Sequence, residues 1–367
     1  MTGGEVLAEG EGEPELLYAR GRVERVIDEV HETAEEAGME SEKQILEVMM
    51  LDGPMKGKTQ VVENIMRGEM THPAYNFRLQ KGDKIVLALE SEKGEITNVY
   101  VDDLVREGYV KLLVVAFCIL LVVLGGLKGF KSLISLVITI SAVLGVLLPL
   151  ILRGYNPLML AVLVSIGVSV VILLIVGGIN GKSLAAIIGT SGGVLIAGAI
   201  ASVTGIAANL TGLDEESIML MSIPQNVDFS YQGLLFAGII IGALGAMMDI
   251  GMSIASAIDE VKKANPELGI GDLFKSGMNV GRDVMGTMSN TLVLAYTGSA
   301  LPLLLLFMAY DTPLVKIINM DFIVSEIVRA VAGSIGLILA IPITAASAGF
   351  LSKSHFRLPV KLKKKEI

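Results

Sequence analysis

The stretch GLLFAGIIIGALGAMMDIGMSIASAIDEV, residues 233–261, decides the fold class, because most of it is apolar and long enough to cross a bilayer. Asp249 nevertheless lies well inside it, among glycines, serines and methionines. A charge at that depth costs about 2.5–3.5 kcal/mol on insertion scales, so it predicts a group that is paired, protonated or hydrated. The small and polar residues recur at steps of three or four, which places them on one side of a helix. These residues are Gly238, Gly242, Ala246, Asp249, Ser253, Ser256 and Glu260.

The composition agrees with a membrane protein. Of 367 residues, 52% are hydrophobic, 41 are glycine and none is tryptophan, which is too apolar for an ordinary soluble chain. The single cysteine, Cys118, excludes a disulfide framework, and the three histidines are too scattered to predict a metal site. Since the chain has no phosphate-binding loop and no hydrolase or metalloprotease motif, we expect neither an enzyme nor a cofactor.

Charge divides the chain into segments of different character. Residues 1–108 hold 24 acidic and 12 basic residues, a net charge of −12, so the remainder must carry +3 to reach the total of −9. We therefore expect an acidic disordered tail, a β-rich soluble domain, a transmembrane helical domain and a basic cytoplasmic tail. The predicted boundaries are 1–17, 18–108, 109–352 and 353–367.

Five runs rich in Val and Ile predict strands in the soluble domain, and turn residues separate them. DGPMKG, residues 52–57, predicts a hairpin connection. Five short strands in so few residues are best matched by a small OB-like barrel. Because the domain is acidic and poor in aromatic residues, we exclude nucleic acid as a partner. The predicted strands are 19–30, 43–51, 58–66, 83–90 and 94–101.

Seven apolar stretches are long enough to span about 30 Å of hydrocarbon. Lysine and arginine gather in alternate loops and in the C-terminal tail, which places the C-terminus in the cytoplasm and the acidic domain outside. An exported domain usually follows a signal or anchor helix, and residues 1–21 have neither, so we expect a native anchor helix before this chain. The predicted spans are 110–127, 132–152, 158–179, 183–206, 234–258, 284–308 and 326–349.

The sixth predicted span offers polar partners for Asp249. Helical spacing places Asp283, Thr287, Asn290 and Thr297 on one side. Counted from Glu260 and Arg282 at 1.5 Å per residue, Asp249 and Asn290 lie about 16 Å and about 12 Å deep. We therefore expect a polar layer that forms an ion or substrate path, or that only holds two helices together. Its members are Asp249, Ser253, Ser256, Thr287, Ser289 and Asn290.

Other charges flank this layer. Asp259, Glu260, Arg282 and Asp283 gather at the predicted inner mouths of two spans, where they form either a gate or an ordinary solvated loop. Glu326 and Arg329 are spaced for mutual neutralisation near the outer surface, and Asp228 is a further candidate partner for Arg329. Methionines such as Met247 and Met288 surround the layer, and we interpret them as packing residues rather than ligands of a soft metal.

Several segments resemble the YibE/F-like family of bacterial multi-pass membrane proteins. The resemblance rests on LDGPMKG (51–57), YNPLMLAVLV (155–164), residues 233–261, SGMNVGRDVMGTMSNTLVLAY (276–296) and EIVRAVAGSIGLILAIPITA (326–345). It covers roughly residues 45–349 and implies a location in the bacterial cytoplasmic membrane. It implies no reaction, substrate or catalytic residue.

We thus predict an α-helical polytopic membrane protein with a β-rich outer domain. Our first hypothesis is a secondary transporter or permease for a small solute, ion or peptide, with Asp249 as the coupling group. The alternative is a membrane scaffold or envelope assembly factor whose outer domain binds an envelope protein. Besides the lipid bilayer, the sequence allows a homo-oligomer as a partner.

Overall fold

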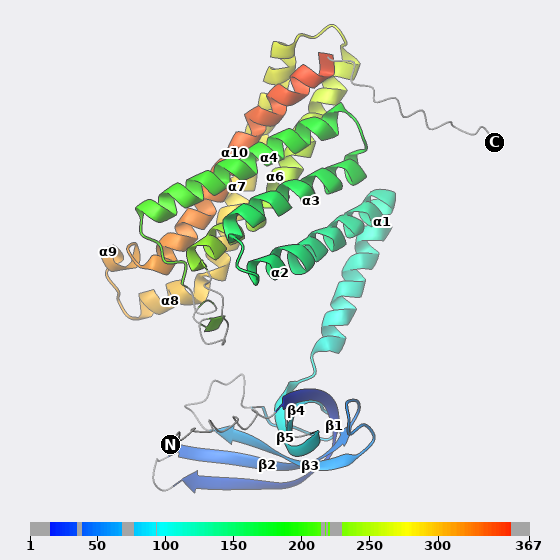
Figure 1. Ribbon diagram of the computed structural model, residues 1–367, viewed down its shortest axis with the longest axis vertical. Coiled ribbons are helices and arrows are strands. Elements are labelled where there is room, and N and C mark those ends of the chain that lie inside the picture. The colour runs from blue at the N-terminus through cyan, green and yellow to red at the C-terminus, as the bar shows by residue number, and fades with distance from the viewer. Residues whose placement is uncertain are drawn as a thin grey trace, which may run out of the picture. The chain divides into compact units, whose positions relative to one another are not determined.

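The structure is a computed structural model, and it describes residues 15–34, 39–67, 77–92, 94–213, 217, 219–220 and 230–353. The chain divides into two compact units, Met1–Ile119 and Leu120–Ile367. The first unit contains the strands and the second most of the helices (Figure 1).

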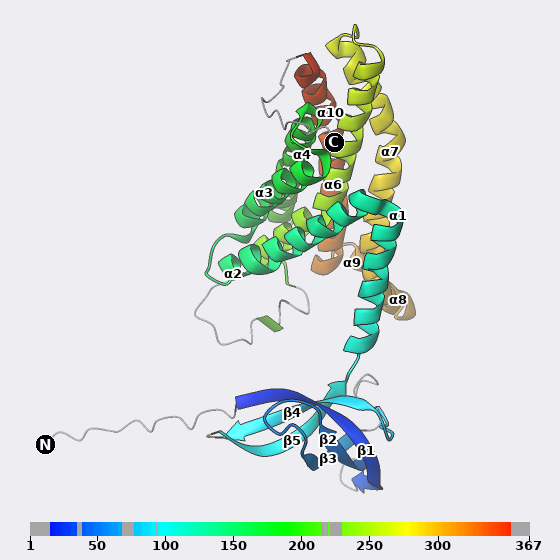
Figure 2. The same ribbon diagram turned by 90° about the vertical axis from the view of Figure 1, so that its right-hand side faces the viewer.

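The strands close into a five-stranded barrel in the order β1-β2-β3-β5-β4, with β1 paired to both β2 and β4 (Figure 2). All pairs are antiparallel except β3 with β5, which share the single parallel bridge Glu63–Tyr100. All five predicted strands are present, although β1 begins before the predicted end of the acidic tail. The bounds are β1 Glu15–Ala34, β2 Met39–Met50, β3 Thr59–Arg67, β4 Lys84–Glu92 and β5 Glu95–Leu104.

Alternating side chains explain why these segments form a barrel. On β4, Ile85, Leu87 and Leu89 are fully buried while their neighbours are not, as expected for a strand with one face toward a core. The predicted hairpin is confirmed, because the Gly57 N–H donates to the Met50 carbonyl at 2.9 Å. Gly53 and Gly57 have φ of 72° and 79°, which glycine adopts without strain.

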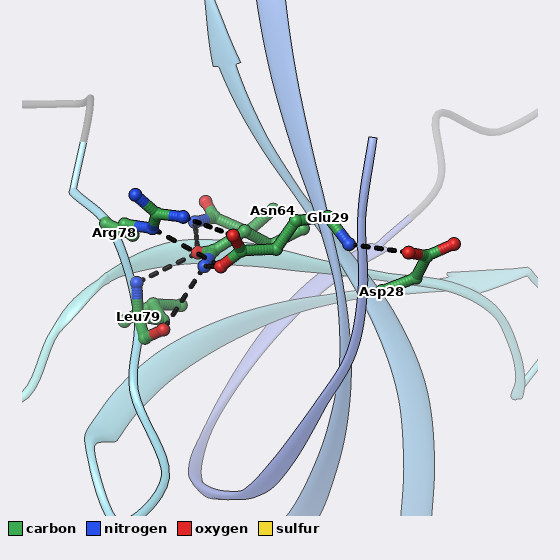
Figure 3. A network of polar contacts seen from close by, with 6 residues as sticks. Asp28, Glu29, Asn64, Arg78 and Leu79 are labelled. Carbon is green, nitrogen blue, oxygen red and sulfur yellow. Dashed lines mark hydrogen bonds and ion pairs between the residues drawn. The ribbon is translucent and has the colours of Figure 1, made fainter. Parts of the chain in front are cut away.

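One polar network lies inside this mostly apolar barrel (Figure 3). The Gln44 amide, 1% exposed, donates to Glu29 Oε1 at 2.8 Å and to the Leu79 carbonyl at 3.2 Å. Gln44 Oε1 accepts from the Leu79 N–H at 2.9 Å and from Asn64 at 3.2 Å. Arg78 pairs with Glu29. The network therefore fastens the segment before β4 to β1, β2 and β3.

Long apolar helices make up the second part of the chain, and five of them could cross a membrane by length and composition. A sixth candidate consists of α7 and α8, which are bent by 59° where they meet. The bounds are α1 Glu107–Ala142, α2 Leu148–Ile151, α3 Pro157–Gly177, α4 Gly181–Ala207, α6 Tyr231–Ala264, α7 Ile270–Ser299, α8 Leu301–Ala309, α9 Leu314–Ile317 and α10 Asp321–Lys353.

The first two predicted spans fall in one 45-residue helical segment, Glu107–Ile151, which also contains a π-helical turn at Val143–Leu147. Its backbone leaves helical geometry at Gly126, with φ 56° and ψ −134°, a conformation that a residue with a Cβ rarely adopts. The structure therefore describes five or six candidate spans rather than seven.

The helices of the second unit pack around α10, which contacts α4, α6 and α7 (Figure 1). Small residues allow this approach: a Cβ added at Gly189 of α4 would lie 1.7 Å from Thr344 Oγ1 of α10. A Cβ at Gly281 of α7 would lie 2.2 Å from Ile341 Cγ2 of α10. Close contact of this kind is the usual basis of helix association in lipid.

Candidate functional site

One side of α6 is open and polar. From Tyr231 to Ile258, its exposed residues are Gly238, Gly242, Gly245, Asp249 and Ser253. By contrast, the exposed residues of α10 are the apolar Ile327, Val331, Leu339 and Phe350. The predicted stripe is therefore a real surface of α6, although Ala246 and Ser256 are only partly exposed.

The same kind of surface continues on α7, at an edge of the helix bundle (Figure 2). Between Gly271 and Thr291, the exposed residues of α7 are all polar or glycine, and Arg282, Asp283, Thr287 and Asn290 are among them. The two helices approach closely at Gly242 of α6, since a Cβ added there would lie 2.4 Å from the Tyr296 hydroxyl of α7. We call these exposed residues of α6 and α7 the open polar face.

The predicted polar layer falls mainly on this face. The side chain of Asp249 forms no hydrogen bond or ion pair within the described part of the chain. The side chain of Asn290 forms none there either. The Thr287 hydroxyl donates to the carbonyl of Val284 at 2.9 Å, within its own helix. Asp249 and Asn290 are thus both on the surface, and no bond joins them to each other.

The charges near the C-terminal end of α6 and on the first turns of α7 form local contacts. Lys263 Nζ lies 2.8 Å from Asp259 and 2.7 Å from Glu260. Arg282 lies 3.4 Å from the side-chain oxygen of Asn279, and its neighbour Asp283 is exposed. These contacts within single helices suit a solvated helix end and give no support to a gate.

A second polar cluster lies inside the bundle. Arg329 Nη1 and Glu326 Oε1, both on α10, are 3.0 Å apart, with side chains 26% and 25% exposed. The half-buried Tyr296 of α7 is within electrostatic reach of both charges. The predicted pairing of Glu326 with Arg329 is thereby confirmed, whereas Asp228 lies outside the described residues.

Further buried hydroxyls lie on the same two helices. Ser325 and Ser334 of α10 are 7% and 8% exposed, and their hydroxyls find no hydrogen-bond partner among the described residues. The same is true of the hydroxyls of Ser289 and Tyr296 on α7. Thr291 and Thr344, on the same helices, instead donate to their own helix carbonyls at 2.9 and 2.8 Å.

The packing of α7 against α10 sets the heights of these hydroxyls along the helices. Antiparallel α7 and α10 approach at Gly281 and Ile341, and again where Tyr296 is near Arg329. Ser289 and Ser334 lie between these points at similar heights, and Ser289 is about 10 Å along α7 from Tyr296 at 1.5 Å per residue. We call Tyr296, Arg329, Glu326, Ser325, Ser334 and Ser289 the inner polar seam.

Sequence reasoning missed Tyr296, Ser325 and Ser334 and placed Ser289 in the layer of Asp249. The signal was weak, because single hydroxyls in apolar helices usually bond to their own backbone. A hint was available in the seven-residue spacing between Ser289 and Tyr296, which puts both on one side of a helix. The methionines follow the packing interpretation: Met247 is fully buried, and Met248, Met252, Met285 and Met288 pack against the same core.

The barrel unit has a hollow of its own. A cavity of about 690 Å³ lies between the barrel and the first turn of α1. Arg20, Lys84, Arg106, Asp83 and Glu107 contribute charges of both signs to its lining. Arg20 also pairs with Asp52 at 2.5 Å and with Glu107, which ties the start of α1 to the barrel.

These features define a membrane protein with a small β-barrel and a polar interior between apolar helices. The family profile of the YibE/F-like proteins matches residues 113–354, more than half of the chain, and the protein belongs to this family. The match covers the helices and not the barrel strands. Comparison with curated proteins and with solved structures finds no match in either set.

Proposed function

We propose that the protein is a secondary transporter or permease for a small solute, ion or peptide. The observation that carries this proposal is the inner polar seam, in which the hydroxyls of Ser289, Tyr296, Ser325 and Ser334 have no hydrogen-bond partner among the described residues and which also holds the Glu326–Arg329 ion pair. Buried polar groups in proteins are normally satisfied by protein, water or ligand. In a membrane domain, such groups typically mark a substrate or ion path.

The proposed topology has seven spans, with the barrel outside and the C-terminus in the cytoplasm of a bacterium. Glu107–Ile151 has 45 residues, or about 68 Å at 1.5 Å per residue, which is twice what one crossing needs. Two crossings separated at Gly126 use this length. The alternating basic loops support the orientation, and the broken α7–α8 pair resembles the discontinuous helices of many transporters.

We further propose that the outer domain is OB-like. Five strands, a closed sheet and one non-sequential parallel contact between β3 and β5 support this assignment.

Asp249 is the proposed coupling group, because this carboxylate lies at membrane depth and has no ion pair among the described residues. The test uses liposomes that contain the purified protein and a trapped pH indicator, with casein hydrolysate added outside as a mixed probe of amino acids and small peptides. We expect a change of internal pH with the natural protein and at least a tenfold slower change with Asp249→Asn. Asp102→Asn, which removes an exposed carboxylate from strand β5 of the barrel, is the matched control.

An equal rate for Asp249→Asn and the natural protein would refute the coupling role. No change above protein-free liposomes, with this probe and with inorganic ion gradients, would favour the alternative, a membrane scaffold whose barrel binds an envelope protein. The charged cavity between the barrel and α1 favours that alternative. Its test is whether the paired change Lys84→Ala and Arg106→Ala abolishes a complex that is captured by chemical crosslinking in intact cells.

A further inference from the structure

We propose that the open polar face is where two copies of this chain meet. The face runs from Gly238 to Ser253 on α6, a length of about 22 Å at 1.5 Å per residue, out of about 30 Å of hydrocarbon. Polar groups at that depth are tolerated only against protein or in a water-filled space. Whatever covers this face must therefore replace lipid along most of a crossing.

The chain's own first helix does not suit this role. The exposed residues of α1 include Leu113, Val123, Leu124 and Leu127, all more than 70% exposed, and residues 112–124 contain no charged or amide side chain. An apolar helix would leave the Asp249 carboxylate and the Asn290 amide without partners, at a cost of about 1–3 kcal/mol for each buried group.

A second copy supplies the polar surface that is needed. Asp249 only accepts hydrogen bonds when ionised, whereas the Asn290 amide can donate two. Both lie at similar heights, because the approaches of Gly281 to Ile254 and of Gly242 to Tyr296 put Asn290 level with about residue 247 of α6, about 3 Å along the helix axis from Asp249. Two copies related by a two-fold axis along the membrane normal keep equal depths, so Asp249 of one copy can accept from Asn290 of the other.

The glycines provide the close approach that such an interface requires. A Cβ added at Gly238 or Gly245 would meet no atom within 4 Å in the described part of the chain, so packing among these residues gives no reason for the bare backbone there. In membranes, small residues four apart let two helices come into direct contact. Gly238 and Gly245, seven residues apart and so on one side of α6, fit a helix of the second copy, whereas Gly242 already lies against Tyr296 of its own chain.

The test compares two glycine variants of the full-length protein in detergent and in liposomes. Gly245→Leu places a side chain on the open polar face, and Gly167→Leu places one on the exposed side of α3, where a Cβ also meets nothing within 4 Å. Both should retain the natural melting temperature within a few degrees, because neither touches the chain's own atoms. We expect Gly245→Leu to weaken dimerisation at least tenfold and Gly167→Leu to leave it unchanged.

A crosslinking experiment gives an independent answer. In a Cys118→Ser background, Ser253→Cys should form a dimer with a short bifunctional thiol reagent, whereas Leu163→Cys on α3 should not. A natural protein that is monomeric in liposomes would overturn the proposal, as would Gly245→Leu dimerising like the natural protein. Crosslinking of Ser253→Cys to a different protein would also overturn it. The inference does not require transport, since a scaffold would need the same cover.

Discussion

Replacing Gln44 by methionine should loosen the barrel where the segment before β4 is fastened to it. The Gln44 side chain bonds both the N–H and the carbonyl of Leu79, a residue that is 1% exposed. Methionine fills a similar volume but leaves both groups without a partner. An orphaned buried polar group costs about 1–3 kcal/mol, so the pair costs about 2–6 kcal/mol.

Hydrogen exchange of the full-length protein in detergent, followed by mass spectrometry, measures this loss. Each 1.36 kcal/mol is about tenfold in an equilibrium constant, so peptides that contain the Leu79 amide should exchange about 30-fold faster or more. The matched control is Gln80→Met, since Gln80 is exposed and its side chain makes no bond in the network of Figure 3. An acceleration below threefold, or an equal one in the control, would refute the reasoning.

Two further predictions concern charges. Arg329→Met removes the ion pair with Glu326, and because both side chains are about a quarter exposed, we expect the lower end of the usual loss of about 3–5 kcal/mol. The double variant Glu326→Gln, Arg329→Met should recover most of the lost free energy of unfolding, measured by unfolding in denaturing detergent. A double variant as unstable as Arg329→Met alone would contradict the prediction. The second prediction concerns acid. The backbone N–H of Arg20, with help from its guanidinium, holds the pKa of Asp52 below the ordinary 3.8. A lowered folded-state pKa stabilises the barrel above about pH 4, and that contribution disappears as the pH falls through the folded pKa. Asp52→Asn should therefore lose stability at pH 7, by a modest amount because the side chain is 33% exposed, and respond less to acid between pH 4 and 2. Circular dichroism of the full chain checks this, and an unchanged acid response would count against it.

The barrel strands were predictable because their information is local. Residues 83–90 were predicted to form a strand. The observed strand is Lys84–Glu92, in which buried side chains alternate with more exposed ones. DGPMKG contains its own turn chemistry, with Gly53 and Gly57 at positive φ. The same holds for the membrane helices, because length and hydropathy are sufficient to find them.

The arrangement of polar groups inside the helical unit was less predictable. Helical spacing showed that Asp249 lies on a small and polar side of α6, but hydropathy does not say which side is covered, since packed and lipid-facing sides are both apolar. The charges near Tyr296 (those of Arg329 and Glu326) belong to α10, so their proximity depends on the register of α7 against α10. That register depends on contacts such as Gly281 with Ile341, which no local pattern contains.

The closed barrel limits how another protein can bind the β-domain. Many proteins recruit a peptide by letting it extend a sheet, which requires a strand with unpaired backbone groups along one edge. Among the described residues, each of the five strands has a neighbour on both sides, and only the single bridge between β3 and β5 is thin. A binding protein would therefore have to contact side chains, either in the charged cavity beside α1 or on the outer wall of the barrel, where Tyr18, Val61 and Ile65 are at least half exposed. Substitutions at those three positions would change recognition without disturbing the hydrogen bonds that close the barrel.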